Sequence, residues 1–218
     1  MRIGVLLGGC GLYDGSDAQE SVLVLLALES EGERPVLVAP DIRQERTVDH
    51  LTTVAVDGES RNVLRESARL ARGSIRGLDR SLAEDLEALI IPGGYGPVVN
   101  FSTGFARPGV GRGIVPEVEA FLRHFLEARK PIGLVGLGEV PIRTLLGQEM
   151  EEPPAPHGPK HLTVDDERRI VHTPGFSAFT RLGDVRTGIE AMVREVMRLM
   201  EERLREETGA RGGGALGP

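Results

Sequence analysis

The segment 130–146 has the pattern by which α/β enzymes present a catalytic nucleophile. Its first half is typical of a helix end, a proline break and a buried strand, and a short helix is expected from Pro141. A sharp turn from strand to helix pushes the side chain at its apex into a cleft, where a Ser or Cys can attack a substrate. At this apex the chain has Gly136, followed by Leu137 and Glu139. The sequence therefore predicts an enzyme scaffold whose usual nucleophile is missing.

Gly93 and Gly94 end a second predicted strand and could supply backbone N–H groups to the same site. Free N–H groups beside a strand end can stabilise an oxyanion. The alternative is a tight turn that needs glycine for a positive φ. The residues alone leave both interpretations open.

Glu20 and Glu139 are the carboxylates expected near this turn. Glu20 lies in the first turn of a predicted helix, where it could act as an acid or base, or form a hydrogen bond to a thiolate. Acidic residues are also common in first turns because they complement the helix dipole. Together the two carboxylates could activate a water molecule.

Cys10 is the only cysteine and lies in the Gly-rich end of the first predicted strand. A thiol near backbone amides and helix N-termini can have a lowered pKa and react. The alternative is a small buried apolar residue. A single cysteine excludes an intrachain disulfide and favours a reducing compartment, so we expect a cytoplasmic protein.

The histidines show no metal-binding spacing. His157 and His161 are four residues apart, but neighbouring prolines disfavour a helical pair, so no metal site is expected. His161 and His172 lie near a predicted hairpin and could approach the cleft. The glycines of 8–11 match neither a phosphate-binding loop nor a dinucleotide fingerprint, and no cofactor is predicted.

Composition excludes several classes of partner. The chain has 218 residues, a net charge of -7 and 27% charged residues, so nucleic acid and anionic membranes are not expected as partners. The start of the chain lacks the length and cleavage site of a signal peptide, and no apolar run is long enough to cross a membrane. Nearly all basic residues are Arg, which suggests a GC-rich or thermophilic source.

Buried strands and helices alternate along the chain, with strands expected at 2–7, 35–39, 88–91 and within 130–135. This alternation predicts an α/β fold with a mostly parallel sheet covered on both faces. Ligands of such folds bind beyond the carboxyl ends of the strands, so the Gly-rich strand ends should meet in one cleft.

Residues 1–208 are predicted to form a single domain, and 209–218 a flexible tail. Residues 162–164 and 169–172 are expected to form a β-hairpin excursion. The Pro/Glu-rich stretch 149–159 is expected to be a surface excursion, and 97–115 a loop.

The sequence makes specific predictions about the first and the last helix. Ser16 and Gln19 have the spacing of a capping box at the start of the first helix. The segment 22–28 is apolar on nearly every side, so this helix should be deeply buried. The last helix is expected to run from Asp184 to Arg205.

Several motifs together resemble ElbB-type proteins, the isoprenoid-biosynthesis amidotransferase-like members of the PfpI/class I glutamine amidotransferase-like superfamily. The similarity covers nearly the whole chain except the tail. The motifs are 9–16 with Glu20, 61–73, 90–96 with Asn100, 130–133, and Lys160 with His161. The resemblance implies a flavodoxin-like three-layer sandwich, often dimeric, in which a Cys on the nucleophile elbow faces a Glu from the first helix. It also implies glyoxalase-type conversion of 2-oxoaldehydes.

The resemblance assigns roles to individual residues. Glu20 matches the family acid, and Gly93 and Gly94 match the glycine pair beside the site. The nucleophilic Cys of the family falls at Gly136, and the Ala-Pro that follows it is also changed. The substrate-binding residues expected around this position are Gly93, Gly94, Tyr95, Asn100, Gly136, Leu137, Glu139 and His161.

Three hypotheses follow. The first is a diverged, non-catalytic protein with a small-molecule-binding cleft at the former nucleophile elbow. The second is a glyoxalase- or amidohydrolase-type enzyme that uses Cys10, or the carboxylates Glu20 and Glu139. The third is a structural or regulatory homodimer with a vestigial cleft.

Overall fold

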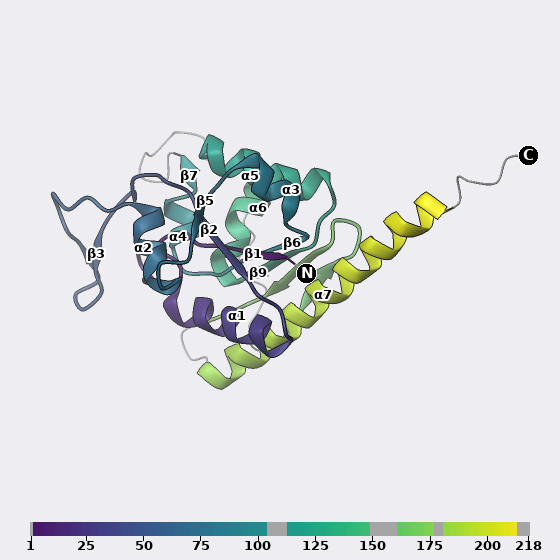
Figure 1. The fold of residues 1–218 in the computed structure, drawn as a ribbon. Coiled ribbons are helices and arrows are strands. Elements are labelled where there is room, and N and C mark those ends of the chain that lie inside the picture. The colour runs from purple at the N-terminus through teal and green to yellow at the C-terminus, as the bar shows by residue number, and fades with distance from the viewer. Residues whose placement is uncertain (1, 104–112, 149–160, 177–180, 213–218) are drawn as a thin grey trace, which may run out of the picture.

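A seven-stranded sheet runs through the middle of the protein in the computed structural model, which describes residues 2–103, 113–148, 161–176 and 181–212 (Figure 1). The strand order is β10-β11-β9-β6-β1-β2-β5. All neighbours are parallel except β10 and β11. The strands are β1 (Ile3–Leu6), β2 (Val36–Ala39), β5 (Arg76–Gly77), β6 (Ala88–Ile91), β9 (Ile132–Val135), β10 (Thr163–Asp165) and β11 (Ile170–Thr173).

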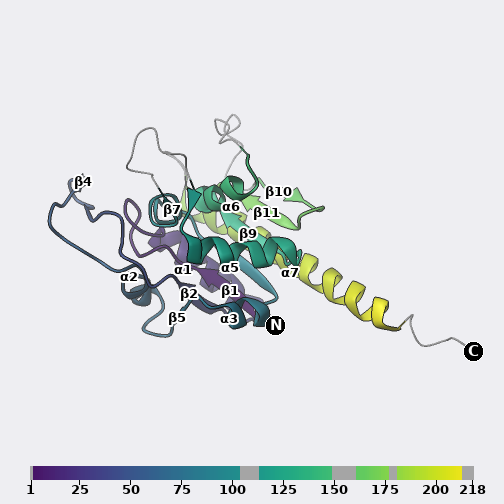
Figure 2. The ribbon, with the colours of Figure 1, turned by 90° about the horizontal axis from the view of Figure 1, so that it is seen from above.

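Helices cover both faces of the sheet, as Figures 1 and 2 show. One face packs against α1 (Ala18–Ser30), α2 (Val63–Leu70) and α7 (Leu182–Gly212). The other packs against α3 (Arg80–Asp85), α5 (Pro116–Glu127) and α6 (Val140–Leu145). Alternate residues of each strand enter opposite cores, because successive side chains of a strand point to opposite faces. The predicted three-layer α/β fold with a mostly parallel sheet is confirmed.

The predicted hairpin forms, but it belongs to the main sheet. β10 and β11 pair antiparallel, and β11 also pairs parallel with β9, so the hairpin forms one edge of the sheet rather than an excursion. The pairing with β9 buries Ile170 and Val171. Because β9 and β11 are far apart in the sequence, the local pattern cannot predict that they pair or in which register.

The region expected as a loop contains regular structure. It holds α4 (Gly96–Val99) and a two-stranded ladder of β7 (Ser102–Thr103) and β8 (Gly113–Ile114). A second small ladder joins β3 (Val48–Asp49) to β4 (Val54–Ala55). The ladder at β7 and β8 is held by tertiary packing of Phe101 and Ile114 in the core, which overrides the high Gly/Pro content.

Asp17, and not Ser16, caps α1. The Asp17 carboxylate accepts hydrogen bonds from the backbone N–H groups of Gln19 and Glu20. The Ser16 hydroxyl instead accepts a hydrogen bond from Gly8 N–H at 2.9 Å, inside the protein. Both residue types are good caps, so local preference alone did not separate them.

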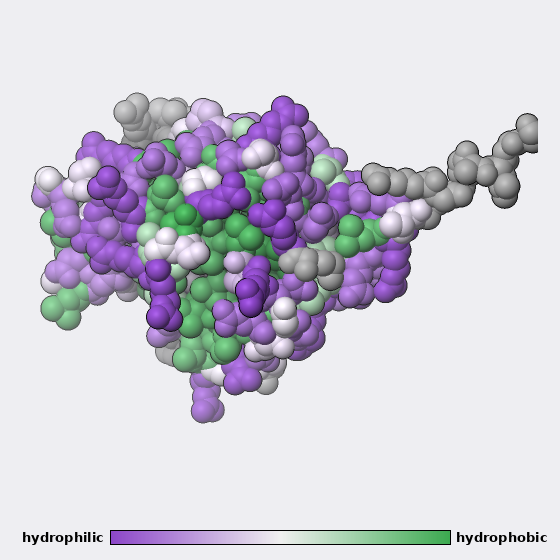
Figure 3. All heavy atoms as spheres, in the orientation of Figure 1, coloured by the Kyte–Doolittle hydropathy of each residue, from purple (hydrophilic) through white to green (hydrophobic). Residues whose placement is uncertain are grey.

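α1 is less buried than its sequence predicts. Val22 and Leu26 are 53% and 48% exposed, although Val24 and Leu28 lie in the core. Apolar atoms gather on the face of the protein shown in Figure 3, over the region of α1. An uninterrupted apolar run gives no periodicity from which to tell the buried side of a helix from its outer side.

The last helix is longer than expected. α7 continues past Arg205 to Gly212, so residues 209–212 are helical rather than the start of a tail. One interior glycine costs a helix only about 1 kcal/mol relative to Ala, and the adjacent Ala and Arg are good helix formers. Residues 213–218 and the predicted excursion 149–159 lie outside the described residues. Within the described part of the chain, the helices are too short or too polar to cross a lipid bilayer.

Candidate functional site

The buried carboxylate of Glu20 is held by backbone N–H groups from two distant segments. Glu20 is only 3% exposed. Its Oε2 accepts a hydrogen bond from Gly93 N–H at 2.9 Å, and its Oε1 accepts one from Phe176 N–H at 2.8 Å. The first turn of α1 therefore joins the loops that follow β6 and β11.

Burial raises the pKa of Glu20 to about 7. Removal of the carboxylate from water is the largest cause, and the nearby charge of Asp17 adds to it. The hydrogen bonds from Phe176 and Gly93 act in the opposite direction because they favour the ionised form. Glu20 is therefore a carboxyl group that can gain or lose a proton near neutral pH.

Gly136 has the conformation and direction of a nucleophile-bearing residue. Its φ is +47°, a left-handed conformation that side chains rarely adopt except where a turn is strained. A Cβ at this position would lie 3.7 Å from Oε1 of Glu20 and 3.0 Å from the carbonyl oxygen of Pro174. A short 3-10 helix, η1 (Gly136–Glu139), follows, so the predicted strand-to-helix turn is present.

Two further glycines make room for the Glu20 carboxylate. A Cβ at Gly93 would collide with Oε2, and a Cβ at Gly175 would collide with Oε1. The close approach of backbone to carboxylate on both sides explains why these positions have no side chain. Gly175 and Phe176 were not identified from the sequence, because no local pattern indicates that the segment after β11 reaches α1.

His172 lies beside Gly136 on the neighbouring strand. Its Nε2 is 3.3 Å from the carbonyl oxygen of Gly136 and 3.8 Å from Oε2 of Glu139. The same Glu139 oxygen accepts a hydrogen bond from Arg143 Nε at 2.7 Å. Burial lowers the pKa of His172, while the charge of Glu139 raises it in part. The site thus has a polar side made of a histidine and an ion pair.

His161 and Leu137 lie at the same end of the sheet. His161 is exposed, yet it is close enough to His172 to lower the pKa of that histidine. Leu137 is half-buried and packs against the apolar cluster of Val98, Val99 and Val140. The two expected binding residues therefore lie near the turn, with Leu137 on its apolar side.

Gly93 holds the Glu20 carboxylate in place, and Gly94 makes a tight turn beside it. Gly93 donates its N–H to Glu20, and its carbonyl accepts a hydrogen bond from Asp17 N–H. Both Gly93 and Gly94 are buried. Gly94 has a φ of +80°, as the tight-turn alternative requires. The Gly93 N–H group is already occupied, so it is not free to stabilise an oxyanion.

The Asn100 side chain connects the segments that follow β1 and β2 by hydrogen bonds. Its side chain is buried, and its Nδ2 donates to the carbonyl oxygens of Gly8 and Asp14 at 2.8 and 2.9 Å. Its Oδ1 accepts a hydrogen bond from Glu45 N–H. These hydrogen bonds occupy both ends of the amide and give Asn100 a structural role, while its expected part in ligand binding stays a prediction.

Tyr95 lies at the surface among other aromatic rings. It is 39% exposed and stacks on Tyr13 with ring centroids 6.5 Å apart. Tyr13 in turn contacts the ring of His50. Tyr95 is accessible to a ligand, and in the structure its ring packs against Tyr13.

The charged groups around Cys10 are not the ones around Glu20. It is half-buried, and burial raises the pKa of its thiol, with Glu66 and Asp14 adding to the increase. A reactive cysteine needs the opposite change. Within the described residues no group of three His, Cys, Asp or Glu side chains is arranged to hold a metal ion.

The chain is similar along most of its length to known proteins. No family model matches it. It is 38% identical over 223 residues to glutamine amidotransferase-like class 1 domain-containing protein 3, mitochondrial, of Homo sapiens, covering 91% of this chain and 83% of the relative. It is 36% identical to the ES1 protein homolog, mitochondrial, of Rattus norvegicus, covering 91% and 84%.

A solved structure has the same fold. The crystal structure of an isoprenoid biosynthesis protein with an amidotransferase-like domain from Ehrlichia chaffeensis matches with a TM-score of 0.81 and 32% identity. The match covers 91% of this chain and 99% of that one. It confirms the ElbB-type resemblance and the fold inferred from it.

The comparisons contradict the expected cytoplasmic location. The relatives from Homo sapiens, Rattus norvegicus and Danio rerio are all described as mitochondrial. A single cysteine indicates reducing conditions, which do not separate one intracellular compartment from another. Because the identity to these relatives extends over most of both chains and the fold agrees, the chain belongs to the glutamine amidotransferase-like class 1 domain family, together with the ES1 proteins.

Proposed function

We propose that this protein binds a small molecule at the Glu20–Gly136 turn without covalent catalysis. The supporting observation is the direction in which a side chain at Gly136 would point. A side chain there would point to within 3.7 Å of the Glu20 carboxylate, yet glycine supplies no thiol or hydroxyl. The family resemblance places a nucleophilic cysteine at this position. Loss of a covalent nucleophile lowers a rate by orders of magnitude, while binding groups remain.

The remaining groups suit recognition of a small polar molecule. Gly136, Leu137 and Glu139 are half-buried and therefore partly accessible, unlike Gly93 and Gly94. His172 and the Glu139–Arg143 ion pair supply polar contacts on one side of the turn. Leu137 supplies an apolar contact on the other side.

Restoring the nucleophile tests this proposal. Gly136→Cys introduces a thiol beside Glu20, and the tight 3.0 Å approach to Pro174 O requires only a small shift of that loop. The wild-type protein should convert methylglyoxal to lactate no faster than buffer, whereas Gly136→Cys should gain measurable conversion. Gly136→Ala is the matched control, since it adds the same Cβ without the sulfur.

Two outcomes decide whether the protein binds without catalysis. Gain of activity in Gly136→Cys that is lost in the Gly136→Cys/Glu20→Gln double variant supports a turn that lacks only its nucleophile. Robust wild-type activity that survives Cys10→Ser would overturn the non-catalytic proposal. Circular dichroism of each variant distinguishes lost chemistry from lost folding.

The pKa of Glu20 favours a second candidate, acid–base catalysis on water or on a bound carbonyl compound. A carboxyl group with a pKa of about 7 has a proton affinity suited to transfer near neutral pH. This candidate predicts wild-type activity that is retained in Cys10→Ser and abolished in Glu20→Gln. Its rate would change with pH around 7, where the non-catalytic proposal predicts no activity at all.

A further inference from the structure

An arm of the chain projects from the body of the protein and holds apolar side chains in water. The arm is residues 48–60, which contain the β3–β4 ladder, and Figures 1 and 2 show it extending away from the central sheet. Every residue from 49 to 60 is exposed. Leu51, Val54 and Val56 are 92%, 63% and 39% exposed. Apolar side chains gathered on a projecting element indicate a surface that a partner covers.

The β3–β4 ladder is too small to hold the shape of the arm by itself. Its two strands have two residues each and pair with no other strand of the described residues. A single two-stranded hairpin is marginal in water. Thr53, in the turn between the strands, has a φ of +60°, which is unfavourable for a β-branched residue. Strained backbone of this kind persists where neighbouring structure fixes it, so the arm is suited to a partner that packs on it.

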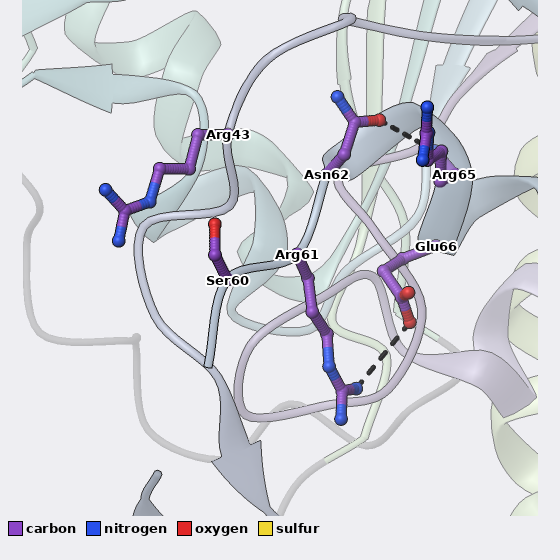
Figure 4. A pocket seen from close by; sticks show the side chains of 6 residues that line it. All are labelled: Arg43, Ser60, Arg61, Asn62, Arg65 and Glu66. Carbon is purple, nitrogen blue, oxygen red and sulfur yellow. Dashed lines mark hydrogen bonds and ion pairs between the residues drawn. The ribbon is translucent and has the colours of Figure 1, made fainter. Parts of the chain in front are cut away.

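The root of the arm is fastened to the body. Gln44 N–H donates to the carbonyl oxygen of Arg61 at 2.9 Å, which joins the two segments from which the arm extends. Figure 4 shows the side chain of Arg61 turned toward Glu66 of α2, with which it forms an ion pair. At the start of the ladder, Val48 N–H donates to the buried carboxylate of Asp14 at 2.8 Å. The arm therefore has a fixed root and a free end.

The other exposed apolar surface of this kind lies on α1. Val22 and Leu26 are 53% and 48% exposed, and residues four apart lie side by side on one face of a helix. Figure 3 shows apolar atoms over this region. Apart from the arm and α1, only Tyr95 and Leu182 are exposed large apolar side chains in the described part of the chain. The arm and the α1 face both stay exposed, so neither covers the other within one copy.

We propose that two copies of this chain associate by exchanging arms, so that the arm of each copy packs on Val22 and Leu26 of the other. A two-fold axis makes such an exchange reciprocal, and one interface then covers both apolar surfaces of both copies. Removal of Leu51 and Val54 from water supplies the hydrophobic free energy for association. The α1 face of the other copy also gives the β3–β4 ladder the neighbour that it lacks in a single copy.

Sedimentation velocity of the full chain tests the association. Over about 1 to 100 μM, the wild-type protein should sediment with twice the 23.5 kDa mass of one chain. Leu51→Asp and Leu26→Lys should each weaken self-association about a hundredfold, because each places an unpaired charge in both contacts of a two-fold dimer. Arg80→Gln, at an exposed ion pair of α3, changes the net charge as Leu51→Asp does and should leave the dimer intact.

A mixture of the two variants tests the pairing of arm with α1. In a mixed dimer, the substituted arm of Leu51→Asp meets the substituted α1 of Leu26→Lys at one contact, where the new charges attract. The other contact has both wild-type surfaces. The mixture should therefore form a dimer, although neither variant does so alone at the same concentration.

Three results would overturn the proposal: a wild-type monomer throughout this concentration range, a dimer that either variant leaves intact, or a mixture that stays monomeric. Leu51 and Leu26 are exposed, so both variants should fold. Circular dichroism spectra that match the wild type separate lost association from lost folding. None of these results bears on the Glu20–Gly136 turn, because the substitutions leave its residues unchanged.

Discussion

Gly136 and Glu20 face each other across the end of the sheet: a Cβ on Gly136 would lie 3.7 Å from the nearer oxygen of Glu20. The backbone at Gly136 has a φ of +47°, and the carboxylate of Glu20 is fixed by two backbone N–H groups. The acid is therefore held in place opposite a position that has no side chain.

Glu20→Gln should change how stability depends on pH. The folded protein holds the Glu20 proton more tightly than the unfolded chain, since folding raises the pKa from 4.5 to about 7. The protonated Glu20 therefore stabilises the fold, and this stabilisation is fully present below pH 4.5 and is lost as the pH rises through 7. The loss is about 3 kcal/mol in the free energy of unfolding.

Urea unfolding at several pH values between 4 and 8 checks this prediction. Glutamine resembles the protonated acid, so Glu20→Gln should become more stable relative to wild type as the pH rises. Glu29→Gln, on the exposed side of the same helix, is the matched control. A constant difference between Glu20→Gln and wild type across this pH range would contradict the raised pKa.

Gly93→Ala should destabilise the protein because its Cβ would collide with Oε2 of Glu20 and with the carbonyl oxygen of Val135. Overpacking of this kind costs about 1–3 kcal/mol. Chemical denaturation measures the effect, and the Gly93→Ala/Glu20→Ala double variant tests its cause. If the collision with Glu20 contributes, the two substitutions are less destabilising together than the sum of their separate effects, while the contact with Val135 remains in both alanine variants of Gly93. Strict additivity would contradict the contact.

Asn100→Ala should cost about 2–4 kcal/mol of stability, because it leaves the buried carbonyl groups of Gly8 and Asp14 and the partly buried N–H of Glu45 without their partner. Thermal unfolding in the absence of any ligand measures this loss. Asn62→Ala, which removes an exposed helix cap, is a milder comparison at about 1 kcal/mol. An unchanged melting temperature for Asn100→Ala would contradict this structural role.

Cys10 should react slowly with thiol reagents at neutral pH. Burial and the charges of Glu66 and Asp14 raise its pKa above 9.0, so the thiolate is scarce at pH 7. The rate of disulfide-reagent labelling should still be rising with pH at pH 9, without a plateau below it, and should be faster in unfolded protein. Rapid labelling of the folded protein with a midpoint below pH 8 would contradict this assignment.

The sequence by itself determined the α/β class and most elements of the sheet. Strands such as 88–91 are short, buried on both faces and followed by Gly or Pro, so their local composition is enough to identify them. It also predicted the turn at Gly136, because a strand-to-helix turn is a local pattern. A first-turn carboxylate alone left the role of Glu20 open, and the family resemblance assigned it as the acid.

Only the tertiary structure decided what surrounds Glu20. Phe176 lies far along the chain, and nothing in its own neighbourhood indicates that its N–H reaches the carboxylate. The same holds for His172, which pairing of β11 with β9 brings beside Gly136. The pKa of Glu20 and the inactivity expected of Cys10 follow from burial and neighbouring charge. Those are properties of packing between distant segments, which residue types and spacing do not contain.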